Sequence, residues 1–325
     1  MADKMDRRNL LKRSALATAG VTLGMSLEER ALLAREAKKP SDGVGAQSPM
    51  PMGKIGDLKI SRVLCGGNLT SGFAHSRDLI YVSSLLRNYF TDEKIFETWE
   101  ICEECGINSA ILRVDDSVIR LVNEYWKNRG GSLQWIAQIK PPQDDLKTDI
   151  KRAVDNGAVG LYLQGGVGDK FAREGRLDLV AEVLDFMKEQ GVIAGIGAHC
   201  LEVVVACEKA GLEPDFYMKT LHRDDYLSAT PKDDRPDFAL PPHDNMWCTN
   251  PQETVAFMKN VKKPWIAFKV LAAGAIAPTV GFEYAFENGA DFACVGMFDF
   301  QVREDAIVAK SILSKRLERQ RGWMG

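Results

Sequence analysis

Residues 191–222 read GVIAGIGAHCLEVVVACEKAGLEPDFYMKTLH, and this stretch decides the fold. The apolar segment Val192–His199 predicts a buried strand, and the pattern of Leu201–Ala210 predicts a helix. Gly211 follows that helix, where a left-handed residue commonly ends a helix, and Phe216–His222 predicts the next strand. A strand, a crossover helix and a second strand in this order are typical of a parallel sheet.

The same unit recurs along the chain. Eight strands are predicted at Ile60–Cys65, Ile107–Arg113, Leu133–Lys140, Ala158–Gln164, Val192–His199, Phe216–His222, Trp265–Ala273 and Phe292–Met297. Helices are predicted near Asp92–Cys105, Ser117–Lys127, Leu146–Asn156, Leu177–Gln190, Leu201–Ala210, Pro251–Asn260, Val280–Glu287 and Arg303–Leu317. Eight such repeats predict a (β/α)8 TIM barrel, in which active sites form at the carboxyl ends of the strands. Two loops that leave strands are long, Gly66–Thr91 and Arg223–Asn250, and we expect Arg223–Asn250 to form a mobile lid over that end.

The amino-acid composition suits an ordinary globular protein and disfavours a nucleic-acid-binding protein. The chain has 325 residues, 45% of them apolar, and a net charge of −3, which suits one barrel with a short extension. Acidic and basic residues are interspersed, and the acidic balance disfavours binding to nucleic acid. The basic stretch Lys315–Arg321 is interpreted as the solvated end of the last helix. The expected partner is therefore a small-molecule substrate.

The amino-terminal residues differ from the rest. Arg7 and Arg8 precede two leucines and Lys12, and a weakly apolar stretch, Ser14–Met25, follows. That stretch is too short to span a bilayer as a helix, so no stable membrane span is expected. The arrangement resembles a twin-arginine (Tat) signal, which implies export by the Tat machinery to the periplasm or another extracytoplasmic space. Residues 1–26 are then the signal, 27–50 a polar linker and 51–325 the barrel domain.

Alternation along the strands predicts which side chains face the barrel interior. In Trp265–Ala273 the apolar set that begins with Ile266 and Phe268 is expected to pack on helices, which turns Lys269 inward. In Phe216–His222 the set Phe216, Met218 and Thr220 is expected to do the same, which turns Lys219 inward. Other polar residues expected in the lumen or at its mouth are Arg113, Gln138, Lys140, Tyr162, Gln164 and His199. Burying so many polar groups is costly without compensation, so we expect a catalytic or binding site there.

Histidines and glycines add to this expectation. All four histidines, His75, His199, His222 and His243, fall at predicted strand ends or in the loops that follow, where at least one is expected to be functional. No metal site is predicted, because no paired inward carboxylates complete one. Gly274 and Gly296 follow the last two strands and offer backbone N–H groups to a phosphate.

The segment Gly53–Gly66, GKIGDLKISRVLCG, resembles the opening of aldo-keto reductases. Gly106-Ile107-Asn108 is similar to that family's approach to its second strand, and a looser likeness extends over most of the barrel. The resemblance implies carbonyl chemistry with NADP, and Lys140 matches the family's lysine at the end of strand three. The family's other catalytic positions hold Ile111, Asp116 and Gln164, which departs from its pattern.

A second resemblance involves the strands around residues 215–220 and 268–274. They look like strands six and seven of class I aldolases of the deoxyribose-phosphate aldolase type. The resemblance implies that Lys219 forms a Schiff base with a carbonyl substrate and that Lys269 assists it.

Three interpretations follow. The leading one is an exported enzyme of aldo-keto-reductase-like ancestry that acts on a carbonyl of a small sugar-like molecule by lysine Schiff-base chemistry, as a lyase or aldolase, without a cofactor. The alternatives are an NADP-dependent oxidoreductase that uses Lys140 and a non-catalytic carbohydrate-binding barrel. The candidate catalytic residues are Lys219, Lys269, Lys140 and His199. The candidate substrate-binding residues are Arg113, Gln138, Gln164, Tyr162, His222, His243, Gly274 and Gly296.

Overall fold

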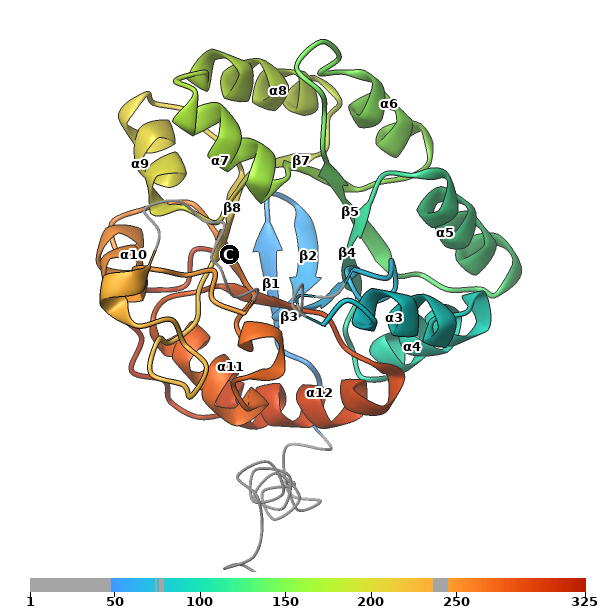
Figure 1. Cartoon of the computed structure of the whole chain (residues 1–325). Coiled ribbons are helices and arrows are strands. Elements are labelled where there is room, and N and C mark those ends of the chain that lie inside the picture. The colour runs from blue at the N-terminus through green and yellow to red at the C-terminus, as the bar shows by residue number, and fades with distance from the viewer. Residues whose placement is uncertain (1–47, 74, 76–78, 236–244) are drawn as a thin grey trace, which may run out of the picture. The chain divides into compact units, whose positions relative to one another are not determined.

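The computed structural model describes residues 48–73, 75, 79–235 and 245–325. In them eight parallel strands close into a barrel, in the order β10-β3-β4-β5-β6-β7-β8-β9, which confirms the predicted (β/α)8 TIM barrel (Figure 1). The barrel strands are β3 (Val63–Gly66), β4 (Ser109–Arg113), β5 (Gln134–Ile139), β6 (Gly160–Leu163), β7 (Ile193–Ala198), β8 (Phe216–Thr220), β9 (Trp265–Phe268) and β10 (Phe292–Val295). Each predicted strand has a counterpart.

Helices surround the barrel (Figure 1). They are α3 (Val82–Tyr89), α4 (Asp92–Glu104), α5 (Asp116–Asn128), α6 (Thr148–Asp155), α7 (Gly165–Arg173), α8 (Leu177–Glu189), α9 (Leu201–Lys209), α10 (Pro251–Met258), α11 (Pro278–Glu287) and α12 (Asp299–Leu313). Short 3₁₀ turns are η1 (Lys232–Asp234) and η2 (Ala272–Gly274). No helix in these ranges is long and apolar enough to cross a membrane. The sequence did not indicate α3 or α7, both of which follow strand ends.

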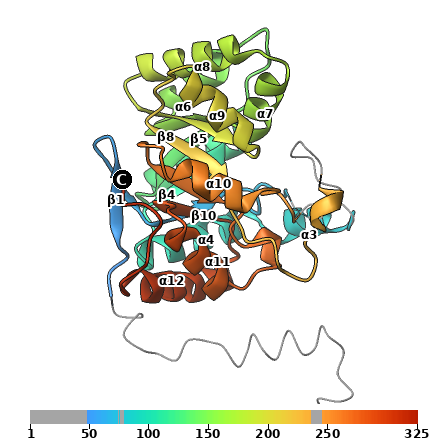
Figure 2. The same ribbon diagram turned by 90° about the vertical axis from the view of Figure 1, so that its left-hand side faces the viewer.

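An antiparallel hairpin of β1 (Met52–Ile55) and β2 (Leu58–Ser61) precedes the barrel. The predicted first strand, Ile60–Cys65, was therefore wrong in extent, because its first two residues belong to β2. Ile55 and Ile60 are fully buried and pack with the interior residues of the barrel, so the hairpin closes one end. In Figure 2 β1 and the carboxyl terminus lie at that end, and α3 lies at the opposite end, where the strands finish.

Two separate hydrophobic clusters identify the inside and the outside of the barrel. The interior cluster draws on alternate strand residues and on no helix, and consists of Leu64, Ile111, Ile136, Tyr162, Phe216, Met218, Ile266, Phe292 and Cys294 with the two hairpin isoleucines. The outer cluster joins the remaining strand residues, including Tyr217 and Ala267, to the helices. The predicted facing of β8 and β9 was therefore wrong. The lumen is a packed apolar core and the polar residues gather at its mouth.

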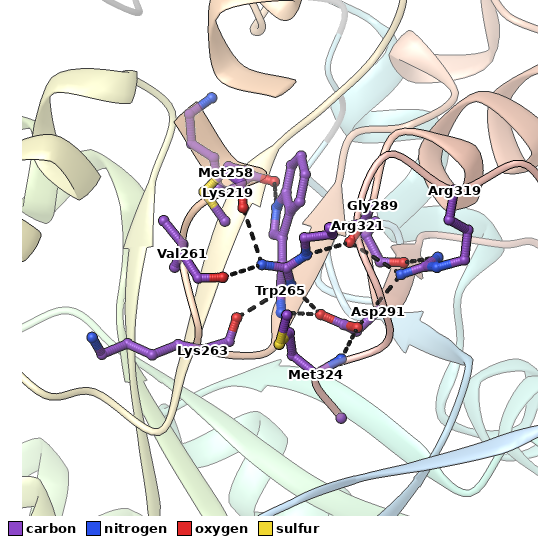
Figure 3. Close-up of polar contacts among 12 residues, drawn as sticks. Lys219, Met258, Val261, Lys263, Trp265, Gly289, Asp291, Arg319, Arg321 and Met324 are labelled. Carbon is purple, nitrogen blue, oxygen red and sulfur yellow. Dashed lines mark hydrogen bonds and ion pairs between the residues drawn. The ribbon is translucent and has the colours of Figure 1, made fainter. Parts of the chain in front are cut away.

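The carboxyl-terminal segment is also placed differently from the expectation. Arg321 is buried and donates hydrogen bonds to the carbonyls of Gly289, Met258, Val261 and Lys263 and to the carboxylate of Asp291 (Figure 3). Asp291 in turn accepts from the backbone N–H groups of Trp265 and Met324, at 2.9 and 2.8 Å. The basic stretch thus ends in a buried ion pair that ties the last residues to the starts of β9 and β10.

Candidate functional site

His199 follows β7 at the mouth of the barrel and is paired with Asp169 on α7. The carboxylate of Asp169 lies 2.7 Å from Nδ1 of His199 and accepts the backbone N–H groups of His199 and Cys200, each at 3.0 Å. Both side chains are nearly buried, at 8% and 7% exposure. Since an ionised carboxylate only accepts hydrogen bonds, Nδ1 carries the proton and a neutral His199 holds its lone pair on Nε2.

Burial governs the charge of this histidine. It lowers the pKa of His199 to about 4, and the attraction of Asp169 only partly opposes that effect. The ring is therefore neutral at pH 7. No described residue makes a hydrogen bond to Nε2, so this atom is available as a proton acceptor.

Glycines allow α7 to approach β7 closely enough for this contact. A Cβ atom on Gly168 would lie 2.5 Å from the carbonyl oxygen of Gly197, and one on Gly197 would lie 2.5 Å from the carbonyl oxygen of Leu163. Gln164 begins α7 as its N-cap, with its side-chain oxygen 3.0 Å from the N–H of Val167. The side-chain amide of Gln164 therefore caps the first turn of α7, whereas it was predicted from the sequence to bind substrate.

Aromatic rings and a lysine surround His199. The rings of Trp247 and Phe268 lie 4.6 and 5.3 Å from its ring, measured between centroids. The ammonium of Lys269 lies 4.1 Å from the centre of the Trp247 ring, a cation–π contact, and 2.7 Å from Nε2 of His75. His75 also contacts the amide nitrogen of Asn68 at 3.0 Å. His75 comes from the long loop 66–91, and Trp247 comes from the long loop 223–250 that was predicted to cover the mouth.

The backbone around Lys269 is strained. Lys269, Ala272 and Ala273 have φ angles of 61°, 45° and 55°, in the left-handed region that residues other than glycine seldom occupy. Lys269 lies one residue beyond the end of β9, so strand alternation does not set its direction. Strain of this kind costs of order 1–3 kcal/mol per residue and concentrates at functional sites. We therefore take Lys269 as the lysine of the candidate site.

Lys219 occupies a different place from the one predicted. It is fully buried in β8, in the alternation row of Tyr217, which packs on the helices. Its ammonium donates to the carbonyl and hydroxyl oxygens of Thr220, at 3.0 and 2.8 Å. The Thr220 hydroxyl in turn donates to the carbonyl of His199 at 3.0 Å. Lys219 therefore lies behind the mouth, where it supports the backbone of His199.

His222 is engaged in holding the loop that carries Trp247. Its Nδ1 donates to the carbonyl of Arg223 at 2.9 Å, and its Nε2 accepts from the N–H groups of Trp247 and Cys248 at 3.0 and 2.8 Å. Burial lowers the pKa of His222 to about 4, so the ring is neutral and both nitrogens are used. The expected substrate-binding role does not fit this saturated ring.

The remaining predicted residues are spread around the mouth. Gln138 donates to the hydroxyl of Tyr162 at 2.6 Å, and this pair borders the apolar interior. Burial raises the pKa of Tyr162, which therefore stays protonated. Arg113 ends β4 and Lys140 follows β5, both open to solvent. Gly274 and Gly296 are exposed after β9 and β10, and His243 lies outside the described residues.

Sequence reasoning missed three members of the site. Asp169 lies on a helix that was not predicted, His75 was noted but given no role, and Trp247 was assigned only to a covering loop. The glycine-rich run 165–169, GGVGD, directly after a predicted strand was the available signal for Asp169. In the ranges that the structure describes, no group of three or more His, Cys, Asp or Glu residues could hold a metal ion.

Comparison with known proteins gives a likeness of fold. No protein-family model matches the chain, and no curated protein matches it. A protein from Pseudomonas aeruginosa described as an aldo-keto reductase superposes with a TM-score of 0.55 at 15% identity, over 83% of this chain and 99% of that one. The holo form of aldo-keto reductase AKR11C1 from Bacillus halodurans gives 0.54 at 12% identity, over 83% and 94%. A Gox0644 variant in complex with NADPH gives 0.52 at 9% identity, over 80% and 88%. At these identities the chain is similar to aldo-keto reductases in its barrel fold.

Proposed function

We propose that this protein is an enzyme that acts on the carbonyl group of a small, sugar-like molecule bound at the mouth of the barrel. The observation that carries the proposal is the buried Asp169–His199 pair with Lys269 beside it. A base oriented by a carboxylate, next to a lysine, is an arrangement suited to proton transfer and covalent catalysis. The packed apolar lumen leaves the mouth as the place for this chemistry.

In this proposal Lys269 is the nucleophile. Its neutral amine nitrogen forms a bond to the carbonyl carbon, and the carbonyl oxygen leaves as water with the two amine protons. The imine nitrogen then takes back from His75 the proton that the lysine ammonium gave to it, and a protonated imine results. The imine nitrogen then accepts the electron pair of a neighbouring C–H or C–C bond, and Nε2 of His199 takes the proton that is released. His75, 2.7 Å from the lysine, is placed to accept the proton that Lys269 must lose before it attacks. When a C–H bond breaks, the proton that His199 takes comes from the carbon next to the imine; when a C–C bond breaks, as in an aldolase, it comes from the hydroxyl group of the fragment that leaves as a carbonyl compound.

The proposal moves the Schiff base from Lys219 to Lys269. The Lys219 ammonium is fully buried and bonded to Thr220, and its strand row faces the helices. A substrate carbonyl in the mouth would have to pass the backbone of β8 to reach it. Lys219 instead supports the site through Thr220 and His199.

The nicotinamide alternative fits the described residues poorly. At the positions where the aldo-keto reductase resemblance expects a catalytic aspartate, tyrosine and histidine, Ile111 packs in the apolar lumen, Asp116 is exposed and paired with Arg152, and Gln164 caps α7. Lys140 is the one matching member and is exposed. We derive no hydride-transfer step from this set, although the fold is shared with a structure that contains NADPH.

Trapping with borohydride tests the central claim. The purified protein is mixed with a panel of small aldehydes, ketoses and aldoses, reduced with borohydride, and digested for peptide mass analysis. We expect a stable adduct on Lys269 with at least one compound, and no adduct in Lys269→Met. Lys219→Met should still be labelled at Lys269. An adduct that maps to Lys219, or an active compound that labels neither lysine, contradicts the proposal.

The same panel addresses the other two interpretations. Turnover of any compound excludes a pure carbohydrate-binding barrel. Absorbance of the purified protein beyond the protein band, together with nucleotide released on denaturation, would favour the NADP-dependent alternative instead.

We further propose export by the Tat machinery to an extracytoplasmic compartment, on the strength of Arg7 and Arg8 with the segment that follows. These residues lie outside the described ranges. Replacing both arginines by lysine should retain the protein in the cytoplasm with its fold unchanged, as judged by fractionation and circular dichroism. Normal export of that variant would remove the Tat interpretation.

A further inference from the structure

Arg113 lies at the mouth of the barrel and forms an ion pair with the carboxylate of Asp115. It ends β4, about opposite β8 in the barrel order, so it lies across the mouth from His199 and Lys269. Its guanidinium carbon lies 4.4 Å from the centre of the Phe73 ring. The nearest carboxylate oxygen, on Asp115, is 3.7 Å away, beyond hydrogen-bonding distance.

The Arg113 guanidinium is therefore attracted to Asp115 by charge without a direct hydrogen bond. A guanidinium carries five N–H donors, and no described residue accepts a hydrogen bond from them. By contrast, Arg120, one helical turn into α5, donates to both oxygens of Asp92, one at 2.6 Å and the other at 2.9 Å. The cation–π contact with Phe73 limits the freedom of the guanidinium, so less side-chain freedom is lost when an acceptor binds.

A second cation lies on the neighbouring strand. Arg113 pairs in register with Gln138 of β5, and Lys140 is the residue that directly follows the end of β5. Lys140 is exposed and forms no ion pair with any described residue. Neighbouring strands are about 4.8 Å apart, so the two cations are carried by adjacent strand ends at the mouth.

We propose that Arg113 and Lys140 form a subsite for an anionic oxygen group, a carboxylate or a phosphoryl, at the end of the substrate remote from its carbonyl. The two oxygens of such a group match the parallel N–H donors of a guanidinium. The Lys140 ammonium would add a second positive charge, and its flexible side chain does not require one orientation of the anion. The inference rests on the proposed function for the role of the other end of the substrate, and it makes that substrate an acidic carbonyl compound.

Direct anion binding tests the subsite without any need for turnover. The full chain is titrated calorimetrically at low ionic strength with inorganic phosphate in one arm and with malonate in the other. We expect saturable binding in at least one arm, which also tells a phosphoryl subsite from a carboxylate subsite. Arg113→Gln should weaken it by about tenfold or more, since a charge-assisted bidentate contact is lost. Lys140→Gln should weaken it less.

Matched variants make the result specific. Arg120→Gln removes a more exposed arginine on the following helix and should leave the affinity unchanged. Arg113→Lys keeps the positive charge but loses the two parallel N–H donors of the guanidinium. Its anion affinity should lie between those of wild type and Arg113→Gln. Equal affinities in wild type and Arg113→Gln, equal losses in Arg120→Gln, or no saturable binding of either anion would overturn the subsite. If anion binding behaves as expected while no lysine is trapped by borohydride, the subsite stands and the Schiff-base chemistry falls.

Discussion

The carboxylate of Asp169 contacts both the ring and the backbone of His199, so the direction of the imidazole is tied to the position of α7. One oxygen holds Nδ1 and the other holds two successive backbone N–H groups. The ring can neither rotate nor change tautomer without breaking these contacts. A base that is fixed in this way keeps its free nitrogen directed away from α7.

Replacing Asp169 by asparagine should therefore slow turnover of a carbonyl substrate by roughly two orders of magnitude, with little change in KM. The amide presents a donor where the carboxylate accepted, which favours the wrong tautomer of His199. Asp185→Asn, on the exposed face of α8, is the matched control and should behave as wild type. Unchanged kcat in Asp169→Asn would show that the pair is purely structural.

Gly168→Ala tests the same contact from the opposite side. The added Cβ atom would lie 2.5 Å from the carbonyl oxygen of Gly197. The position of the Cβ atom is set by the helix backbone and the oxygen belongs to the strand backbone, so α7 must move away from β7. We expect a loss of kcat similar to that of Asp169→Asn, together with about 1–3 kcal/mol of lost stability in urea unfolding. Gly322→Ala, where a Cβ atom has no neighbour within 4 Å, should change neither. Full activity in Gly168→Ala would contradict the tight-approach argument.

The two buried histidines should make the fold sensitive to mild acid. Burial lowers the pKa of His199 and of His222 to about 4 from an ordinary value of 6.5, so between these values the unfolded chain binds protons that the folded chain does not. The contribution of the two neutral histidines to the free energy of unfolding is complete above about pH 6.5 and is lost as the pH falls toward 4. The free energy of unfolding should drop by about 1.4 kcal/mol per pH unit for each histidine once the pH is well below 6.5.

Urea unfolding at several pH values between 6.5 and 5 measures this slope above the range in which most carboxylates titrate. His222→Gln should lower the stability at every pH and reduce the slope by about half, since one of the two histidines is gone. A flat profile for wild type over this range would mean that the histidines are not neutral in the folded protein.

The buried ion pair at the other end of the barrel should dominate the stability of the carboxyl-terminal segment. Arg321→Met leaves Asp291 buried without its main counter-charge and frees four backbone carbonyls, so we expect a loss of about 3–5 kcal/mol in urea unfolding. Arg316→Met, at an exposed position five residues earlier, should cost little. If the two variants unfold at the same urea concentration, the contacts of Figure 3 do not contribute to stability.

The sequence by itself determined the barrel. Segments such as Val192–His199 and Leu201–Ala210 carry local signals, because burial on both faces makes a strand apolar and a glycine suits the end of a helix. The fold also implies that chemistry lies at the ends of strands, which led to His199 and Arg113 before any contact was known.

The direction of the side chains in β8 and β9 was decided only by the tertiary structure. Both alternating sets are apolar there, with Phe216 and Met218 on one side and Tyr217 on the other, because a parallel strand in a barrel is buried against the lumen and against the helices. Alternation therefore carries no signal, and the closure of the barrel sets which row faces inward. This is why Lys219 was expected in the lumen.

Asp169 required the tertiary structure for a related reason. It lies 30 residues before His199, on a short helix that the sequence pattern does not predict. It contacts the histidine only because glycines allow α7 to pack closely against β7. His75, Trp247 and Lys269 likewise come from three separate loops. Local residue preferences determine which segments are strands and helices, whereas the site depends on long-range packing that brings those segments into contact.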